Sequence, residues 1–183
     1  QFFLVGDLEK LPFKSESFEL IYCAFTLEHL DNPQRVIDEA IRVLKTDGNL
    51  VFIAPNFGAP NRASPPNNNS RVRKLLLGFI YDLVWLFFNY QDLKWQSVKP
   101  LMYKERYESD WDTTVEPYIL SLIKYLQNYG LEILDWSVCW EEELAKPRSF
   151  QKIIQTIAKL RIYPFIFWGP HLVVSARKTN YLK

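Results

Sequence analysis

The sequence predicts an α/β fold built around a mostly parallel sheet. Two apolar runs, residues 18–24 and 49–54, flank an amphipathic segment at residues 33–44. Strand, helix and strand joined by short loops form a βαβ unit, whose strands run parallel and whose crossover is right-handed. Residues 18–24 (FELIYCA) are nearly continuous in their hydrophobicity, which is typical of a strand buried on both faces.

Short signals bound these elements. Residues 1–5 (QFFLV) form another apolar run that ends at Gly6-Asp7, which predicts a further buried strand. Pro33 opens the helix, because proline is tolerated in a first helical turn. Asp47-Gly48 ends the helical segment and turns into the strand at 49–54. Ligands of such sheets bind beyond the carboxyl ends of the strands, so we expect the loops that follow these strands on one rim.

The remaining chain alternates between further core elements and two insertions. Residues 57–70 are rich in Asn, Pro and Ser and predict a loop. We expect helices at 71–88, at 116–129 and near 150–160, and strands at 131–140 and 171–177. This predicts a core made of residues 1–56, 116–140 and 170–183. Residues 57–115 and 141–169 are expected to form aromatic-rich cap insertions that bind the substrate.

The bulk composition excludes several classes of protein. A formal net charge of +1 gives no basic footprint, so no nucleic acid partner is expected. The two cysteines lie far apart in sequence, show no metal-ligand spacing, and are interpreted as buried thiols of a cytoplasmic protein. The longest apolar stretch, residues 75–88, is shorter than the roughly 20 residues of a membrane span. No metal site is predicted.

One run of motifs carries more information than the composition. In chain order it consists of Asp7, Leu11-Pro12-Phe13, Ser17-Phe18-Glu19, an apolar strand, Glu28-His29-Leu30, Asn32-Pro33, and Arg42-Val43-Leu44-Lys45 followed by Gly48. Together, these motifs closely resemble the middle of a class I S-adenosylmethionine-dependent methyltransferase of the type 11 group. The resemblance implies a Rossmann-like, seven-stranded, mostly parallel sheet with an antiparallel last strand. It also implies S-adenosyl-L-methionine as the cofactor.

The resemblance assigns roles to six residues. In the family, the position of Asp7 accepts a hydrogen bond from the adenine amino group, and the backbone N–H at Leu8 reaches a ring nitrogen. Cys23, Ala24 and Phe25 follow the strand that faces the methionine part of the cofactor. Taken alone, Gly6-Asp7 is also a common turn, and the strand end also fits simple core packing.

His29 is the candidate catalytic residue and a further cofactor contact. An imidazole can accept a proton from an acceptor hydroxyl or amine near neutral pH. A structural role, in which His29 holds the loop or packs over the cofactor, is the favoured alternative. Methyl transfer depends mainly on alignment of the nucleophile with the methyl carbon, so a dedicated base is optional.

The family's glycine-rich loop and first strands have no counterpart in this chain. Without them, the strands that end at Val5 and Ala24 would not be neighbours, and both would show unpaired edges. We therefore expect roughly 60–80 upstream residues that carry the glycine-rich turn, by analogy with a missing βαβ unit.

The function predicted from the sequence is methyl transfer to a small-molecule acceptor, such as a sugar, a lipid precursor or a secondary metabolite. A non-catalytic scaffold or partner subunit with the same fold is the alternative. The basic and apolar segment 71–88 is expected to be a buried lid helix. Contact with a membrane surface and formation of a homodimer are its other interpretations.

Overall fold

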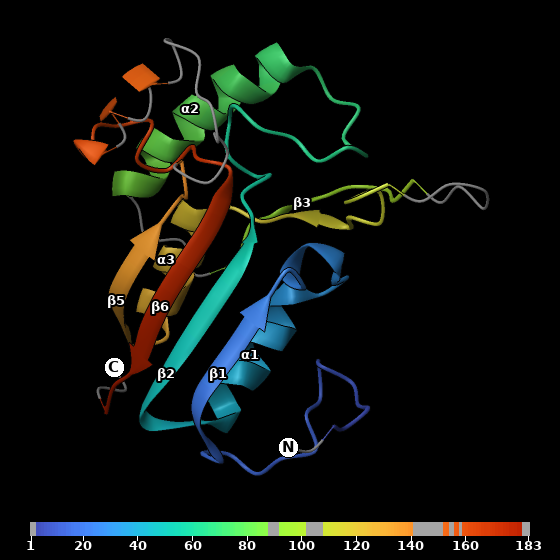
Figure 1. The fold of residues 1–183 in the computed structure, drawn as a ribbon, viewed down its shortest axis with the longest axis vertical. Helices are drawn as coiled ribbons and strands as arrows, with labels where there is room; N and C mark the ends of the chain where they lie inside the picture. Colours follow the sequence, from blue (N-terminus) through green and yellow to red (C-terminus); the bar gives the residue numbers. More distant parts are fainter. Residues whose placement is uncertain are drawn as a thin grey trace.

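The computed structural model describes residues 3–87, 92–101, 108–140, 152–153, 156–157 and 159–180. These residues form an α/β arrangement (Figure 1). The elements are, in chain order, β1 (Phe18–Ala24), the short 3₁₀ helix η1 (Leu27–His29), α1 (Pro33–Val43), β2 (Leu44–Pro55), α2 (Arg71–Phe87), β3 (Gln96–Ser97), β4 (Val115–Glu116), α3 (Ile119–Asn128), β5 (Leu131–Ser137) and β6 (His171–Lys178).

The main sheet has the strand order β1-β2-β6-β5. β1 pairs with β2 in parallel, with Leu20 opposite Asn49 and Ala24 opposite Ile53. β6 is antiparallel to both β2 and β5, so β1, β2 and β5 run in one direction and β6 in the other (Figure 1). The predicted βαβ unit and the antiparallel last strand are therefore confirmed. The described residues supply four strands of this sheet, and the seven-stranded sheet stays a prediction.

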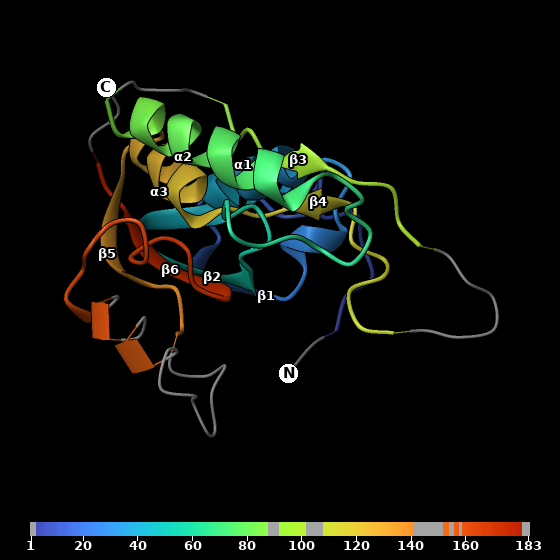
Figure 2. The same ribbon diagram turned by 90° about the horizontal axis from the view of Figure 1, so that it is seen from above.

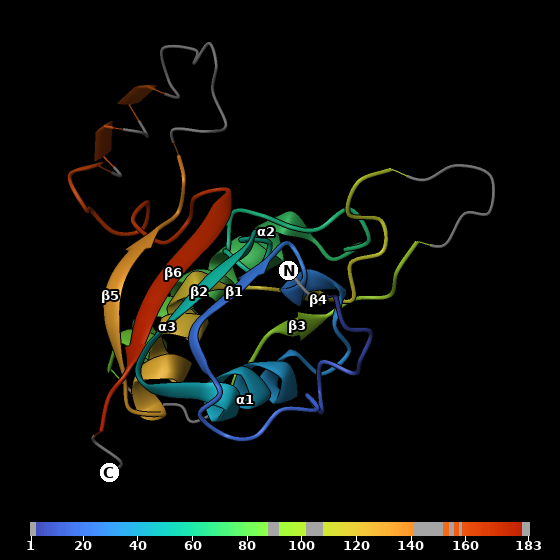
Figure 3. The ribbon, with the colours of Figure 1, turned by 60° about the horizontal axis from the view of Figure 1, so that its bottom comes forward.

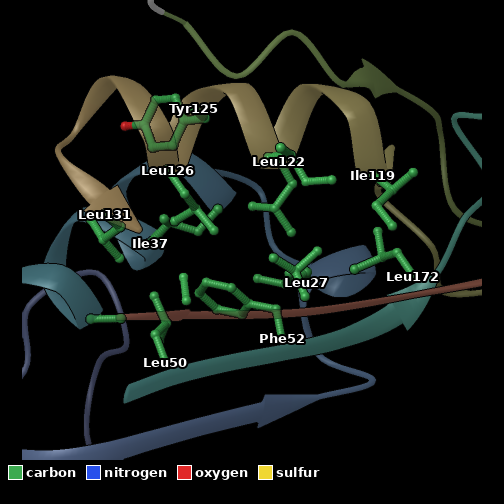
Figure 4. Close-up of a cluster of buried hydrophobic side chains, with 14 of the residues drawn as sticks. Leu27, Ile37, Leu50, Phe52, Ile119, Leu122, Tyr125, Leu126, Leu131 and Leu172 are labelled. Carbon is green, nitrogen blue, oxygen red and sulfur yellow. The ribbon is translucent and has the colours of Figure 1, made fainter. Parts of the chain in front are cut away.

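The core lies between the sheet and the helices α1 and α3, which cover the same face (Figure 2). Alternate side chains of β2 and β6 point into it and are buried, as a strand's period of two requires. They meet Ile37 of α1 and Leu122 and Leu126 of α3 (Figure 4). The buried sheet residues are Leu50, Phe52, Ala54, Leu172, Val174 and Ala176.

The opposite face of the sheet and the outer edge of β1 are open. Leu20 and Tyr22 on β1 are exposed, and no described strand pairs with the free edge of β1. The expectation that residues 18–24 are buried on both faces is therefore wrong, because no described element covers the second face. The unpaired edge expected for β1 is confirmed.

Residues 3–5 form no strand, so the predicted strand at 1–5 is wrong over its described part. A strand needs a neighbouring edge to pair with, and residues 3–5 pair with none of the described strands, the free edge of β1 included. The segment that follows instead wraps around α1 (Figure 3). Arg42 of α1 donates to the carbonyls of Phe13 (2.9 Å) and Leu11 (3.2 Å), and Glu39 accepts from the Leu11 N–H at 2.9 Å.

The other elements follow the predictions, with shifted ends. β2 begins at Leu44 rather than at 49, so the prediction that Asp47-Gly48 forms the turn between helix and strand is wrong, because both residues lie within the strand. α3 begins at Ile119 rather than at 116, because Val115–Glu116 pairs with Gln96–Ser97 in the small β3–β4 ribbon. β5 ends at Ser137. The helix expected near 150–160 falls partly outside the described residues. The division of the chain into a core and two cap insertions stays a prediction.

α2 confirms the predicted helix at 71–88, but it is buried on one side only. Gly78 packs against Pro60, and Asp82 and Trp85 are buried. The helix forms an outer layer of the molecule (Figure 2), and many of its apolar side chains are exposed. The expectation of a buried lid helix is thus wrong for its outward face. No helix among the described residues combines the length and hydropathy that a membrane crossing needs.

Candidate functional site

The loops after β1 and β2 meet at one edge of the sheet, because the two strands are parallel and in register. The Phe25 N–H continues the ladder beyond β1 and donates to the Ile53 carbonyl at 2.8 Å. Phe25 then takes a left-handed conformation with φ of 50°, which turns the chain sharply out of the sheet. This is the edge at which ligands of parallel sheets bind.

The residues predicted to face the methionine part of the cofactor sit at this turn. Thr26 Oγ1 donates to the Ala24 carbonyl at 3.0 Å and fixes the start of the loop. Cys23 is a half-buried free thiol, and its burial raises the pKa of the thiol. A raised pKa keeps the sulfur protonated and unreactive. The Phe25 ring is exposed and stands edge-on to His171, with 6.0 Å between the ring centroids.

His29 lies between two carboxylates. Its Nε2 is 3.7 Å from Glu28 Oε1, and its Nδ1 is 3.4 Å from Asp112 Oδ1. The turn that carries it is held by Thr114, whose N–H donates to the Glu28 carbonyl at 2.8 Å and whose Oγ1 donates to the Leu30 carbonyl at 2.9 Å. Both ring nitrogens therefore face acceptors, which orients the imidazole. The catalytic role of His29 stays a prediction.

Glu28 belongs to the Glu28-His29-Leu30 motif, but the motif alone assigned it no role at the site. Its side chain is 1% exposed, and Oε2 has no hydrogen-bond partner among the described residues. Burial raises the pKa of the Glu28 carboxyl, and the neighbouring His29 opposes this shift. The apolar Leu27 and Leu30 on either side of Glu28-His29 were the available signal that this turn faces inward.

Asp7 and Leu8 reach the same rim through a chain of polar contacts. Asp7 Oδ1 accepts the Glu9 N–H at 2.8 Å, and the Glu9 carboxylate accepts from Asn32 Nδ2 at 2.9 Å. Asn32 is the N-cap residue of α1, directly after the β1 loop. Asp7 is therefore part of a self-bonded turn. Its other carboxylate oxygen accepts no hydrogen bond from the described residues, and Leu8 is exposed beside it.

A cavity of about 810 Å³ lies beyond the carboxyl end of β2, under α2. Its walls come from the loop after β2, one side of α2, the segment before β3, and the start of α3. None of the six predicted site residues lines it. The residues that line it include Pro60, Arg73, Leu77, Tyr81, Trp95 and Ser121.

A buried ion pair forms the polar side of this cavity. Glu116 accepts hydrogen bonds from the Ser64 N–H (2.7 Å), Ser64 Oγ (2.9 Å) and Asn67 Nδ2 (2.9 Å), and it pairs with Lys74 of α2. Burial lowers the pKa of the Lys74 ammonium, and the charge of Glu116 opposes that shift. This cluster joins the loop after β2, α2 and β4.

A second buried carboxylate, Asp82, ties α2 to the rest of the molecule. It accepts hydrogen bonds from the Tyr118 hydroxyl at 2.6 Å and from the Trp168 indole N–H at 2.8 Å. Burial raises the pKa of the Asp82 carboxyl against the effect of these donors. Both acidic side chains at the cavity are thus satisfied by the protein itself.

Two polar atoms at the cavity are not satisfied. Ser121 Oγ and Trp95 Nε1 are both buried and have no hydrogen-bond partner among the described residues. Buried polar groups are nearly always hydrogen-bonded, so these two atoms mark positions where a bound molecule can supply the partner. Trp95 also lines a smaller hollow of about 320 Å³ with Asn32 and Arg35. Trp95 is therefore common to the cavity and to a hollow lined by Asn32 and Pro33, the part of the motif that follows the Glu28-His29 turn in sequence.

Comparison with known proteins finds similarity for the N-terminal segment that forms part of this edge. Residues 1–52 match the sequence model of the methyltransferase domain family. Over these residues the chain is similar to methyltransferase domains. The matched segment contains all six predicted site residues, and the family resemblance read from the motifs is confirmed over it.

Curated methyltransferases match the same region. A sarcosine/dimethylglycine N-methyltransferase of Aphanothece halophytica is 38% identical over 50 residues, which are 27% of this chain and 18% of that protein. A demethylmenaquinone methyltransferase of Renibacterium salmoninarum is 37% identical over 59 residues, which are 31% of this chain and 25% of that protein. The chain thus matches a quarter or less of the length of these two relatives.

The methyltransferase fold extends beyond the matched segment. The solved complex between the Haloferax volcanii Trm112 methyltransferase activator and a methyltransferase contains a similar chain. The similarity covers 98% of this chain and 62% of that chain, with a TM-score of 0.50 and 13% sequence identity. At this identity the likeness concerns the fold alone. It agrees with a Rossmann-like arrangement of the described strands and helices.

Proposed function

We propose that the protein transfers a methyl group from S-adenosylmethionine to a small-molecule acceptor that binds in the cavity under α2. The observation that carries the proposal is the junction at Trp95. There the rim with the family's cofactor motif adjoins a cavity with two unsatisfied polar atoms. The names of the two curated relatives, which mention dimethylglycine and demethylmenaquinone, support a small acceptor.

The residues on the rim fit the adenosyl group. Asp7 keeps one carboxylate oxygen available for an exocyclic amino donor, and Leu8 gives an exposed apolar wall beside it. The backbone at Cys23, Ala24 and Phe25 is fixed at the strand end by the Phe25–Ile53 and Thr26–Ala24 hydrogen bonds. When bound, the cofactor supplies an electrophilic methyl group on its sulfonium.

The protein's own part in the reaction is to position the acceptor and exclude water. Ser121 Oγ and Trp95 Nε1 orient the acceptor, and the walls from α2 shield it. His29 does not line this cavity, and its two nitrogens face Glu28 and Asp112. We therefore assign it a positioning role, in which it holds the 27–30 turn under the cofactor. Alignment alone supplies much of the acceleration in such transfers.

Calorimetric titration of S-adenosylhomocysteine into the protein expressed from its gene tests this proposal. We expect binding that weakens by about 10- to 150-fold in Asp7→Ala, because one hydrogen bond to a charged group contributes about 1.5–3 kcal/mol. Asp135→Ala, which removes an exposed carboxylate from β5, is the matched control and should leave binding unchanged. The absence of binding to a well-folded protein would exclude the enzyme and favour the non-catalytic scaffold.

A further inference from the structure

An exposed apolar stripe runs along the outward face of α2. It consists of five side chains at helical spacings of four, four, three and four residues, which place them on one face. Their exposed fractions range from 40% to 80%. We call these residues the α2 stripe: Val72, Leu76, Ile80, Leu83 and Phe87.

The stripe lies opposite the side through which α2 packs. A side chain at Gly78 would stand 2.6 Å from Pro60, so this position is in close contact with the loop after β2. Asp82 and Trp85 are buried on the same side. The stripe is therefore directed to the outside of the molecule, where α2 forms the outer layer (Figure 2). Most solvated helices carry polar residues on this face.

The charges of α2 are one-sided. Arg71 and Arg73 are exposed at its first turn, and the Arg73 guanidinium has no ion pair among the described residues. The one acidic residue of the helix, Asp82, is buried and bonded to Tyr118 and Trp168. The exposed surface of α2 thus combines positive charge with apolar side chains and carries no negative charge.

We propose that the α2 stripe docks on an anionic lipid surface. A helix that lies in the membrane interface buries an apolar face among the acyl chains and keeps basic residues at the headgroups. The stripe supplies the apolar face, and Arg71 and Arg73 supply attraction to anionic lipid. This surface interaction is distinct from a membrane crossing, for which α2 is too short.

A second copy of the chain fits the stripe less well than lipid does. Stable protein interfaces use about 20–30 residues on each side and are enriched in aromatic residues. The stripe offers five side chains, far fewer than such an interface uses. A lipid surface needs no shape complementarity, so a single helix face is sufficient for it.

Docking would also bring the cavity to the membrane. Arg73, Leu77 and Tyr81 line the cavity and are at the same time exposed beside the stripe. The mouth of the cavity therefore opens next to the lipid surface, so an apolar acceptor can enter from it. This last step rests on the proposed function, whereas the docking itself does not.

Vesicle flotation with the full chain tests the docking. The probes are vesicles of phosphatidylcholine alone and of phosphatidylcholine with phosphatidylglycerol. We expect binding to the anionic vesicles that falls at least tenfold in Leu76→Glu/Ile80→Glu, because each charge must be desolvated in the interface. Leu160→Glu is the matched control, since Leu160 is 66% exposed against 62% for Leu76 but lies outside α2. The control should bind like the wild type.

The basic residues give a second readout. Arg71→Ala/Arg73→Ala should weaken binding to the anionic vesicles by roughly fivefold for each charge removed, with the effect lost at high salt. S-adenosylhomocysteine binding should stay unchanged in Leu76→Glu/Ile80→Glu and in Leu160→Glu, whose positions do not line the cavity, and this separates docking from the proposed function. The proposal is overturned if the wild type binds neither kind of vesicle, or if Leu76→Glu/Ile80→Glu floats with the anionic vesicles as much as Leu160→Glu does. A lipid-free dimer that dissociates in Leu76→Glu/Ile80→Glu would assign the stripe to a second copy instead.

Discussion

The Glu116 carboxylate and the Lys74 ammonium form an ion pair that is almost wholly removed from water, with exposed side-chain fractions of 0% and 12%. Glu116 accepts three further hydrogen bonds from Ser64 and Asn67, whereas Lys74 has one further acceptor among the described residues, the Phe57 carbonyl at 2.7 Å. Removal of Glu116 therefore leaves several buried donors without an acceptor. Removal of Lys74 leaves fewer buried acceptors without a donor. The two residues should differ in their effect on stability.

Glu116→Ala should lower the free energy of unfolding by about 3–5 kcal/mol, because an uncompensated buried charge remains. Lys74→Met should cost less, since Glu116 keeps three donors and the methionine fills the space of the lysine stem. Urea denaturation followed by circular dichroism measures both changes. Glu132→Ala, at an exposed position of β5, should stay within about 0.5 kcal/mol of the wild type. Equal losses in the two cavity variants would contradict this assignment.

Gly78→Ala tests the contact between α2 and the loop after β2. Alanine in a helix interior is ordinarily better than glycine by about 1 kcal/mol. Here the added Cβ would lie 2.6 Å from two atoms of the stiff Pro60 ring. Overpacking costs typically about 1–3 kcal/mol, so we expect the variant to be less stable in urea.

Gly6→Ala is the matched control for this substitution. Its Cβ would meet Pro12 at 3.8 Å, an ordinary contact, so the variant should keep its stability. A Gly78→Ala protein that is more stable than the wild type would show that α2 does not press on Pro60.

Local periodicity predicted the elements that depend on neighbours in sequence. The helix that opens at Pro33, the strand that ends at Ala24 and the helix at α2 all follow from spacing and turn signals within a few residues. The strand expected at residues 1–5 failed because apolar character does not provide a pairing partner. The burial expected for Leu20 and Tyr22 failed for the same reason, since it depends on what covers the sheet.

The residues of the candidate site also differ in whether the sequence alone could reveal them. The Asp7 and Glu28-His29 motifs are contiguous in sequence and could be found there. Lys74 and Glu116 are 42 positions apart in sequence. Trp95 and Ser121 come to line the same cavity only in the folded chain. Tyr81 and Trp95 also line the cavity, but they lie in a part of the chain that resembles no motif.

Ser121→Ala should make the acceptor-free protein more stable by roughly 1 kcal/mol. The substitution removes a buried hydroxyl that has no partner among the described residues, and alanine favours the helix α3. Thermal and urea unfolding measure the gain. Thr113→Val is the contrasting control, because Thr113 Oγ1 donates to the Asp110 carbonyl at 2.7 Å and its loss should destabilise. A destabilised Ser121→Ala protein would mean that the hydroxyl is already satisfied.

The same serine gives a way to recognise acceptors. A small molecule that binds in the cavity should raise the melting temperature of the wild type, because ligands that bind only the folded state stabilise it. The rise should shrink in Ser121→Ala and in Trp95→Phe, each of which removes one of the unsatisfied polar atoms. A molecule that stabilises all three proteins equally binds elsewhere.

Glu28 should make stability depend on pH in a defined direction. Burial raises the pKa of its carboxyl above the ordinary value of 4.5, so the folded state holds this proton to higher pH than the unfolded state does. Between the two pKa values the folded state binds more protons, and the free energy of unfolding therefore falls as pH rises through that window. The glutamine of Glu28→Gln does not titrate, so this decrease in the free energy of unfolding should be absent from the variant.

The measurement is the difference in unfolding free energy between the wild type and Glu28→Gln at steps from pH 4 to pH 7. It should decline as pH rises above 4.5 and then level off. Glu19→Gln should show the opposite sign, because Lys45 lowers the pKa of the exposed Glu19 carboxyl and its small contribution is lost as pH falls. In a His29→Asn background the decline for Glu28 should extend to higher pH, since His29 opposes the effect of burial on the pKa of Glu28. A difference that does not change with pH would show that the Glu28 carboxylate reaches water, and the turn at 27–30 would then be open rather than packed beneath the rim.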